Sequence, residues 1–106
     1  MQTAKLSSEK DFQKTIANGV ALVDFNAPWC GPCRFQKPII KDIAKQFEGQ
    51  ALVSEINVDE NRETAIHFGI QSIPTLILFK NGREIQRFIG LQSAATLSHA
   101  ISKALD

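Results

Sequence analysis

The strongest constraint on the fold is a pair of short apolar runs, residues 20–25 (Val-Ala-Leu-Val-Asp-Phe) and residues 75–79 (Thr-Leu-Ile-Leu-Phe). Successive side chains of a strand point to opposite faces of a sheet, so a run that is apolar at nearly every position predicts a strand covered on both faces. Asp24 is the only ionisable residue in the first run. A sheet that is buried on both faces needs helices on both faces, which predicts an α/β fold.

The segments around these runs alternate between helical and extended patterns. Apolar residues recur at three- and four-residue spacing between residues 32 and 47, which predicts a long helix with a kink, but no break, at Pro38. Asn81-Gly82 is a strong hairpin signal, so the last two strands are expected to be antiparallel. The expected elements are a strand near residues 4–6, a helix at 8–18, a strand at 20–25, a helix at 32–47, a strand at 51–58, a helix at 61–68, strands at 75–79 and 84–89, and a closing helix around 97–105. This order predicts a mixed central sheet flanked by helices on both faces.

Length and charge limit the possible classes of protein. A chain of 106 residues, 43% of them hydrophobic, fits one domain spanning residues 1–106. The 12 Lys and Arg residues balance 11 Asp and Glu residues without charged runs, so neither nucleic acid nor a membrane surface is expected as a partner. The sequence contains no pattern typical of an export signal and no apolar stretch of membrane-spanning length, and we therefore expect a soluble cytoplasmic protein.

Cys30 and Cys33 are the only cysteines of the chain. One helical turn that starts at the first brings the two Cα atoms within the roughly 4.4–6.8 Å that a disulfide needs. In a reducing cytosol such a pair indicates catalysis or metal binding. A structural zinc site needs four ligands, and the two histidines, His67 and His99, lie far apart with no second cysteine pair. A redox-active disulfide, with no metal and no bound cofactor, is the favoured interpretation.

Five features in this order and spacing resemble the thioredoxin family over essentially the whole chain. They are Trp29-Cys30-Gly31-Pro32-Cys33, the preceding Asp24, Ile73-Pro74-Thr75, Phe79-Lys80-Asn81-Gly82, and Gly90. The resemblance implies the thioredoxin fold and the activity of a general protein-disulfide reductase. It also implies disulfide-containing protein substrates, re-reduction by a thioredoxin reductase, and a monomer.

Thiol–disulfide exchange assigns a role to each residue of the motif. Cys30 is the candidate nucleophile, because the N–H groups and dipole at a helix N-terminus favour its thiolate. Cys33 is the candidate resolving thiol, because a neighbouring thiol attacks a mixed disulfide intramolecularly. Gly31 and Pro32 form the spacer, and the absence of histidine there favours a reductant, by resemblance. The resemblance also makes Asp24 the proton acceptor for Cys33, and its burial in an apolar strand should raise its pKa.

A flat, mostly apolar surface around the cysteines is expected to receive protein substrates. By resemblance, the peptide bond before Pro74 is cis, and the backbone of Ile73 pairs with the substrate in a strand-like manner. The seven phenylalanines are expected in the core, and His67 and His99 on helix surfaces. The expected substrate-binding residues are Trp29, Gly31, Pro32, Ile73, Pro74, Ile89 and Gly90.

Two positions depart from the family pattern. Glu55 stands where many thioredoxins carry lysine, and Asn26 stands where bacterial thioredoxins often have tryptophan. A second carboxylate near Asp24 would raise the pKa of the first by like-charge repulsion, so we expect Asp24 and Glu55 to titrate as a coupled pair.

Two alternative functions remain open at this point. The chain could be a thioredoxin-like binding module that grips a partner protein through the surface around the cysteines, with the thiols incidental. It could also be a redox sensor or an oxidase. Reduction of insulin separates the enzyme from the binding module, and equilibration with glutathione places the potential of the cysteine pair.

Overall fold

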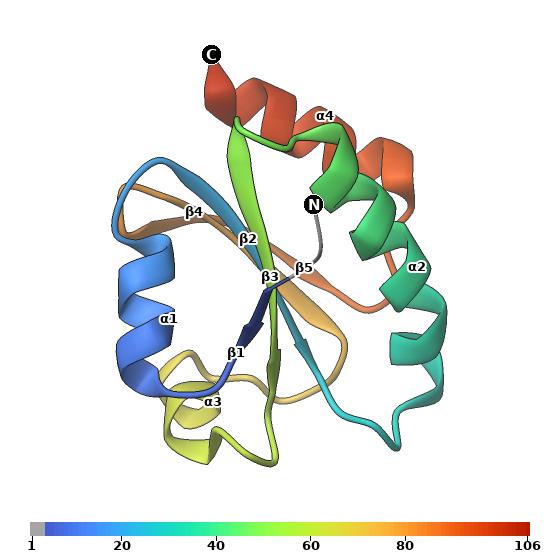
Figure 1. Ribbon diagram of the computed structural model, residues 1–106. Helices are drawn as coiled ribbons and strands as arrows, with labels where there is room; N and C mark the ends of the chain where they lie inside the picture. Colours follow the sequence, from blue (N-terminus) through green and yellow to red (C-terminus); the bar gives the residue numbers. More distant parts are fainter. Residues whose placement is uncertain (1–3) are drawn as a thin grey trace.

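One mixed sheet organises the computed structural model, which describes residues 4–106 (Figure 1). Within this range five strands lie in the order β1-β3-β2-β4-β5. Strands β1, β3 and β2 are parallel, whereas β4 is antiparallel to both β2 and β5. The elements are β1 (Ala4–Leu6), α1 (Glu9–Ile16), β2 (Val20–Asn26), α2 (Gly31–Gln46), β3 (Ala51–Asn57), α3 (Arg62–His67), β4 (Thr75–Lys80), β5 (Arg83–Ile89) and α4 (Ala94–Leu105). The expected α/β fold with a mixed sheet is confirmed.

Helices cover both faces of the sheet. Figure 1 shows α1 and α3 on one side and α2 and α4 on the other. Alternate residues of β2 supply both cores, with Leu22 in the cluster beneath α2 and α4 and Val23 in the cluster beneath α1. Phe12 of α1 is fully buried against the second face. The continuous apolar run at residues 20–25 therefore reflects a central strand with a core on each side.

Three sequence expectations, about Pro38, the phenylalanines and the histidines, had different outcomes. Helix α2 continues without a break through Pro38, as expected. Phe35, however, is 70% exposed, so the expectation that all seven phenylalanines lie in the core is wrong. The core-facing side of α2 is formed by Cys33, Gln36, Ile40, Ile43 and Ala44. The histidines His67 and His99 are exposed on helices, as expected.

The strand register brings three separate segments to one end of the sheet. Phe25 near the end of β2 pairs with Thr75 at the start of β4, and Thr75 pairs in turn with Ile89 at the end of β5. The loop from β2 to α2, the loop before β4 and the loop after β5 therefore meet. These loops carry the cysteine motif, Ile73-Pro74 and Gly90 respectively.

Candidate active site

Cys30 and Cys33 form a disulfide at the start of α2. Their Cα atoms are 5.3 Å apart, and the two residues are 4% and 6% exposed. Cys30 is the N-cap of the helix, and its Sγ accepts a hydrogen bond from the Cys33 N–H at 3.2 Å. Residues 4–106 contain no group of three or more His, Cys, Asp or Glu side chains placed to hold a metal ion. The cysteine pair is thus arranged as a disulfide at a helix N-terminus, where negative charge on sulfur is favoured.

The loop before β4 lies against the disulfide. The peptide bond between Ile73 and Pro74 is cis, as the resemblance implies. The Ile73 carbonyl oxygen lies 3.7 Å from Cys30 Sγ. The loop is held by the Thr75 hydroxyl, which donates to the Ser72 carbonyl at 2.6 Å, and by the Gly90 N–H, which donates to the Pro74 carbonyl at 2.8 Å. The backbone of the loop before β4 is therefore fixed beside Cys30, and the loop after β5 helps to hold it there.

Most of the predicted substrate-binding residues reach the surface near the disulfide. Trp29 and Ile89 are each 67% exposed, so Trp29 is not a core residue. Its indole N–H donates to Asp59 Oδ2 at 2.7 Å, and no sequence signal pointed to Asp59. Pro74 itself is buried. Of the other expected residues, Gly31 and Pro32 are exposed, and Ile73 and Gly90 are partly buried.

Asp24 is a buried carboxyl group in the middle of the sheet. It is 2% exposed, and its Oδ1 has no hydrogen-bond partner among the described residues. Burial and, secondly, the charge of Glu55 raise the pKa of Asp24 from 3.8 to about 7, against smaller lowering effects of Asn26 and Lys37. The predicted upward shift is thus confirmed in direction, with burial as the main cause.

Asn26 and Glu55, the two residues that depart from the family pattern, contact each other. Asn26 Nδ2 donates to Glu55 Oε1 at 3.0 Å. Lys5, Glu55 and Asp24 are register partners on β1, β3 and β2, and register partners on parallel strands point to the same face. A charged row therefore crosses the sheet from exposed Lys5, through half-buried Glu55, to buried Asp24.

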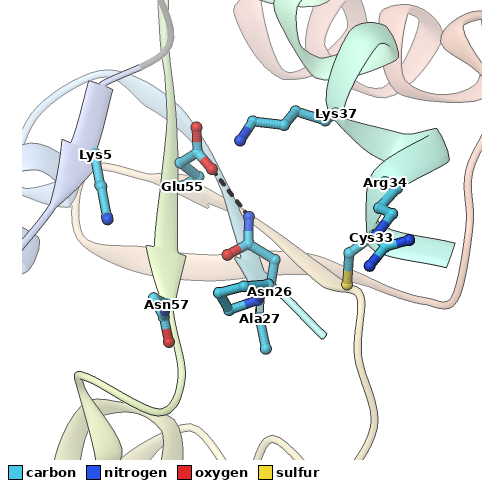
Figure 2. A pocket seen from close by; sticks show the side chains of 9 residues that line it. Lys5, Asn26, Ala27, Cys33, Arg34, Lys37, Glu55 and Asn57 are labelled. Atoms are coloured by element: carbon cyan, nitrogen blue, oxygen red, sulfur yellow. Dashed lines mark hydrogen bonds between the residues drawn. The ribbon is translucent and has the colours of Figure 1, made fainter. Parts of the chain in front are cut away.

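A hollow of about 340 Å³ opens between this row and α2 (Figure 2). Asn26 and Glu55 form part of its floor, and Cys33, Arg34 and Lys37 line it from the helix. In Figure 2 the Lys37 side chain extends from α2 toward Glu55. Sequence reasoning missed Lys37, although its position one helical turn after Cys33 was an available signal. The hollow gives solvent a route to the groups that surround Asp24.

A disulfide that caps a helix, a fixed backbone loop beside it and a buried carboxyl with a raised pKa together define a thiol–disulfide oxidoreductase of the α/β class. Comparisons with known proteins agree. The family model described as Thioredoxin matches residues 3–103. A thioredoxin of Staphylococcus aureus is 40% identical over 98 residues, which cover 92% of this chain and 94% of the relative.

Solved structures show the same likeness. A mutant thioredoxin from Halobacterium salinarum superposes with a TM-score of 0.92 at 31% identity, covering 99% of this chain and 92% of that one. A thioredoxin from Malassezia sympodialis gives a TM-score of 0.88 at 30% identity, with coverage of 99% and 92%. The chain belongs to the thioredoxin family. Its Cys30–Cys33 pair gives it the activity of a protein-disulfide reductase.

Among residues 4–106, no helix is both long and apolar enough to cross a membrane.

Proposed function

We propose that Cys30 attacks substrate disulfides and that Cys33 resolves the product. In the reduced protein the Cys30 thiolate attacks one substrate sulfur, the substrate S–S bond breaks, and the other substrate sulfur leaves and takes up a proton. Cys33 then attacks Cys30 Sγ, which forms the Cys30–Cys33 disulfide and releases the second substrate thiol. Two electrons pass from the cysteine pair to the substrate. The observation that carries this assignment is the place of Cys30 at the N-cap of α2, which favours its thiolate by about 0.3–1 kcal/mol.

Asp24 serves as the base for the resolving step. Cys33 lies within α2 and, unlike Cys30, is not its N-cap, so its thiol must pass its proton to an acceptor when it attacks. A carboxyl with a pKa of about 7 is about half ionised at neutral pH, which suits a group that must both accept and release a proton. The hollow beside Cys33 supports exchange of that proton with solvent.

Substrates dock on the surface around the disulfide. Trp29 and Ile89 provide exposed apolar area, and Gly31 and Pro32 leave the approach to the sulfur atoms open. The Ile73 backbone beside Cys30 supplies strand-like hydrogen bonding to an extended substrate segment. Pro74 and Gly90 hold this backbone in place through their mutual hydrogen bond. The charge-poor character of the surface suits varied protein partners.

The chain acts as a single monomeric domain in the cytoplasm and is re-reduced by a thioredoxin reductase. Thioredoxins are its relatives over most of its length, and its near-neutral charge of +1 points to no nucleic-acid or membrane partner. Turnover with an NADPH-dependent and with a ferredoxin-dependent thioredoxin reductase identifies the electron source. Sedimentation of the reduced and oxidised protein tests the monomer.

Trapping of the mixed disulfide tests the two cysteine roles. With Cys33→Ser, reduced protein mixed with insulin should accumulate a covalent adduct through Cys30, visible by mass spectrometry and released by dithiothreitol. With Cys30→Ser, the adduct and the insulin-reducing activity should both be lost. An adduct that forms through Cys33 in the Cys30→Ser variant, or its absence in the Cys33→Ser variant, would reverse the assignment. Full cellular function of Cys30→Ser would instead favour the binding module.

A further inference from the structure

Gln36 is a fully buried amide one helical turn after Cys33. It is 0% exposed on the core-facing side of α2, among apolar residues. A buried amide requires partners for both its oxygen and its nitrogen. The Gln36 Oε1 accepts from the Gln92 N–H at 2.7 Å, and its Nε2 donates to the Gln92 carbonyl at 3.1 Å. One side chain thus pairs with both backbone groups of a residue 56 positions away.

The residue that Gln36 holds lies in the loop from β5 to α4. The Gln92 side chain donates to the carbonyls of Gly90 and Ile89, at 3.2 and 3.4 Å. The Gly90 N–H continues the connection to the Pro74 carbonyl at 2.8 Å. A chain of hydrogen bonds therefore runs from the cysteine-bearing helix, through residues 89–92, to the loop beside Cys30.

This loop exposes apolar side chains on both sides of Gly90. Ile89 is 67% exposed and Leu91 is 49% exposed. A loop that is already ordered before it binds loses less conformational entropy when a partner docks. Because Gln36 is fully buried, its two hydrogen bonds with the Gln92 backbone order the loop from the inside and leave Ile89 and Leu91 exposed.

We propose that Gln36 is a positioning residue that holds residues 89–92 in the conformation that presents Ile89 and Leu91 to protein substrates. The proposal rests on the docking role given above to the surface around the disulfide, and it adds Leu91 to that surface. Gln36 itself touches neither substrate nor sulfur. Its effect should appear for substrates large enough to contact the loop and be absent for small disulfides.

The test compares Gln36→Met with Gln46→Met. Methionine has a similar length and removes the amide, and it favours a helix about as well as glutamine. Gln46 is an exposed α2 residue whose Nε2 donates to Ser98 Oγ of α4 at 2.8 Å, so the control breaks an α2–α4 bond far from the loop. A second control, Ser93→Ala, removes the N-cap of α4 and tests general destabilisation next to the loop.

Two rates are measured for each variant. One is reduction of insulin with dithiothreitol as the electron source. The other is the second-order oxidation of reduced protein by 5,5′-dithiobis(2-nitrobenzoate). For Gln36→Met the KM for insulin should rise about three- to tenfold, while kcat and the rate with the small disulfide stay within about twofold of wild type. Both controls should leave the KM for insulin within about twofold. An unchanged KM in folded Gln36→Met, an equal loss with both disulfides, or an equal rise in KM for Ser93→Ala would overturn the proposal.

Hydrogen exchange in the wild-type protein provides a test that needs no variant. The Gln92 amide should exchange slowly, because its N–H is bonded to the fully buried Gln36 side chain. A rapidly exchanging Gln92 amide would overturn the proposal even if Gln36→Met does not fold. Absence of insulin reduction by the wild type would instead be a failure of the proposed function, and the exchange result would still report on the Gln36 contact.

Discussion

The replacement Asp24→Asn should stabilise the oxidised protein at alkaline pH and not at acidic pH. Burial and the Glu55 charge raise the pKa of Asp24 from 3.8 to about 7. The native state therefore binds more protons than the unfolded chain between these two values, and the free energy of unfolding falls as pH rises through this window. The contribution of the protonated carboxyl is complete below about pH 3.8 and is lost above about pH 7.

The size of the effect follows from the width of the window. It spans about three pH units, and each is worth ~1.36 kcal/mol, so burial of the ionised carboxylate costs about 4 kcal/mol at pH 8. A neutral asparagine avoids this cost. Its buried amide N–H groups, however, would be left without hydrogen-bond acceptors, which costs about 1–3 kcal/mol at every pH. The difference between the effects at pH 8 and pH 4 cancels that constant offset. It should be about 4 kcal/mol in favour of the variant at pH 8.

Guanidinium chloride unfolding of wild type and Asp24→Asn at pH 4, 6 and 8, without reductant, measures this difference. Asp42→Asn makes the same chemical change at an exposed position of α2 and controls for the substitution itself. A stability difference between wild type and Asp24→Asn that stays constant within about 1 kcal/mol from pH 4 to pH 8 would refute the link between burial and the raised pKa. The variant should also resolve mixed disulfides more slowly, since it lacks the proposed base.

Three further substitutions test the surroundings of the site. Glu55→Gln removes the neighbouring negative charge and should lower the NMR titration midpoint of Asp24; an unchanged midpoint would reject the coupled pair. Lys37→Met removes a cation that favours the ionised form, so it should raise the same midpoint, and a fall would contradict the assigned sign. Asp59→Ala frees the indole of Trp29 and should change the fluorescence of this single tryptophan and raise the KM for insulin about threefold. No change in either readout would show that the indole bond does not position Trp29.

The apolar pattern was enough to predict most of the fold. Residues 20–25 and 75–79 are buried on both faces, so their apolar runs left no choice between an edge strand and a central one. The hairpin was also predictable, because Asn81 and Gly82 both adopt positive φ angles, of 52° and 85°, which few other residue pairs allow. Apart from this hairpin, the neighbours of the strands did not follow from the apolar pattern, since an apolar run specifies burial and not the strand that pairs with it.

Phe35 shows why the pattern of α2 was misread. Its apolar side chain suggested a core position, but the adjacent Gln36 occupies the buried side of the helix. A polar residue is stable there only because both backbone groups of Gln92 complete its hydrogen bonds. This partner is distant in the sequence and follows from tertiary structure alone. Hydropathy alone therefore predicts that Phe35 lies in the core, whereas the adjacent Gln36 is the residue that does.

The active site likewise contains features that could be predicted from the sequence and contacts that could not. The cysteine pair and Asp24 stand out locally, as two neighbouring thiols and as one charge in an apolar strand. The bond between Asn26 and Glu55 depends on the β2–β3 register, and the bond between Trp29 and Asp59 joins the cysteine loop to the segment after β3. Such pairs can be identified only from the three-dimensional structure, because neither partner is unusual in the sequence by itself.

The balance of charges around Asp24 explains how the proposed base stays partly ionised at neutral pH although it is buried in the core. Burial alone opposes the ionised form, and Glu55, at the position where many thioredoxins carry lysine, opposes it further. Lys37 acts from α2 in the opposite direction, while Asn26 both favours the ionised form and binds the Glu55 carboxylate. The resulting pKa of about 7 leaves the ionised carboxylate present at neutral pH, although this form destabilises the fold. An apolar residue at position 24 would therefore increase stability at neutral pH and remove the proposed proton acceptor, so the site retains a carboxyl that the core alone would not favour.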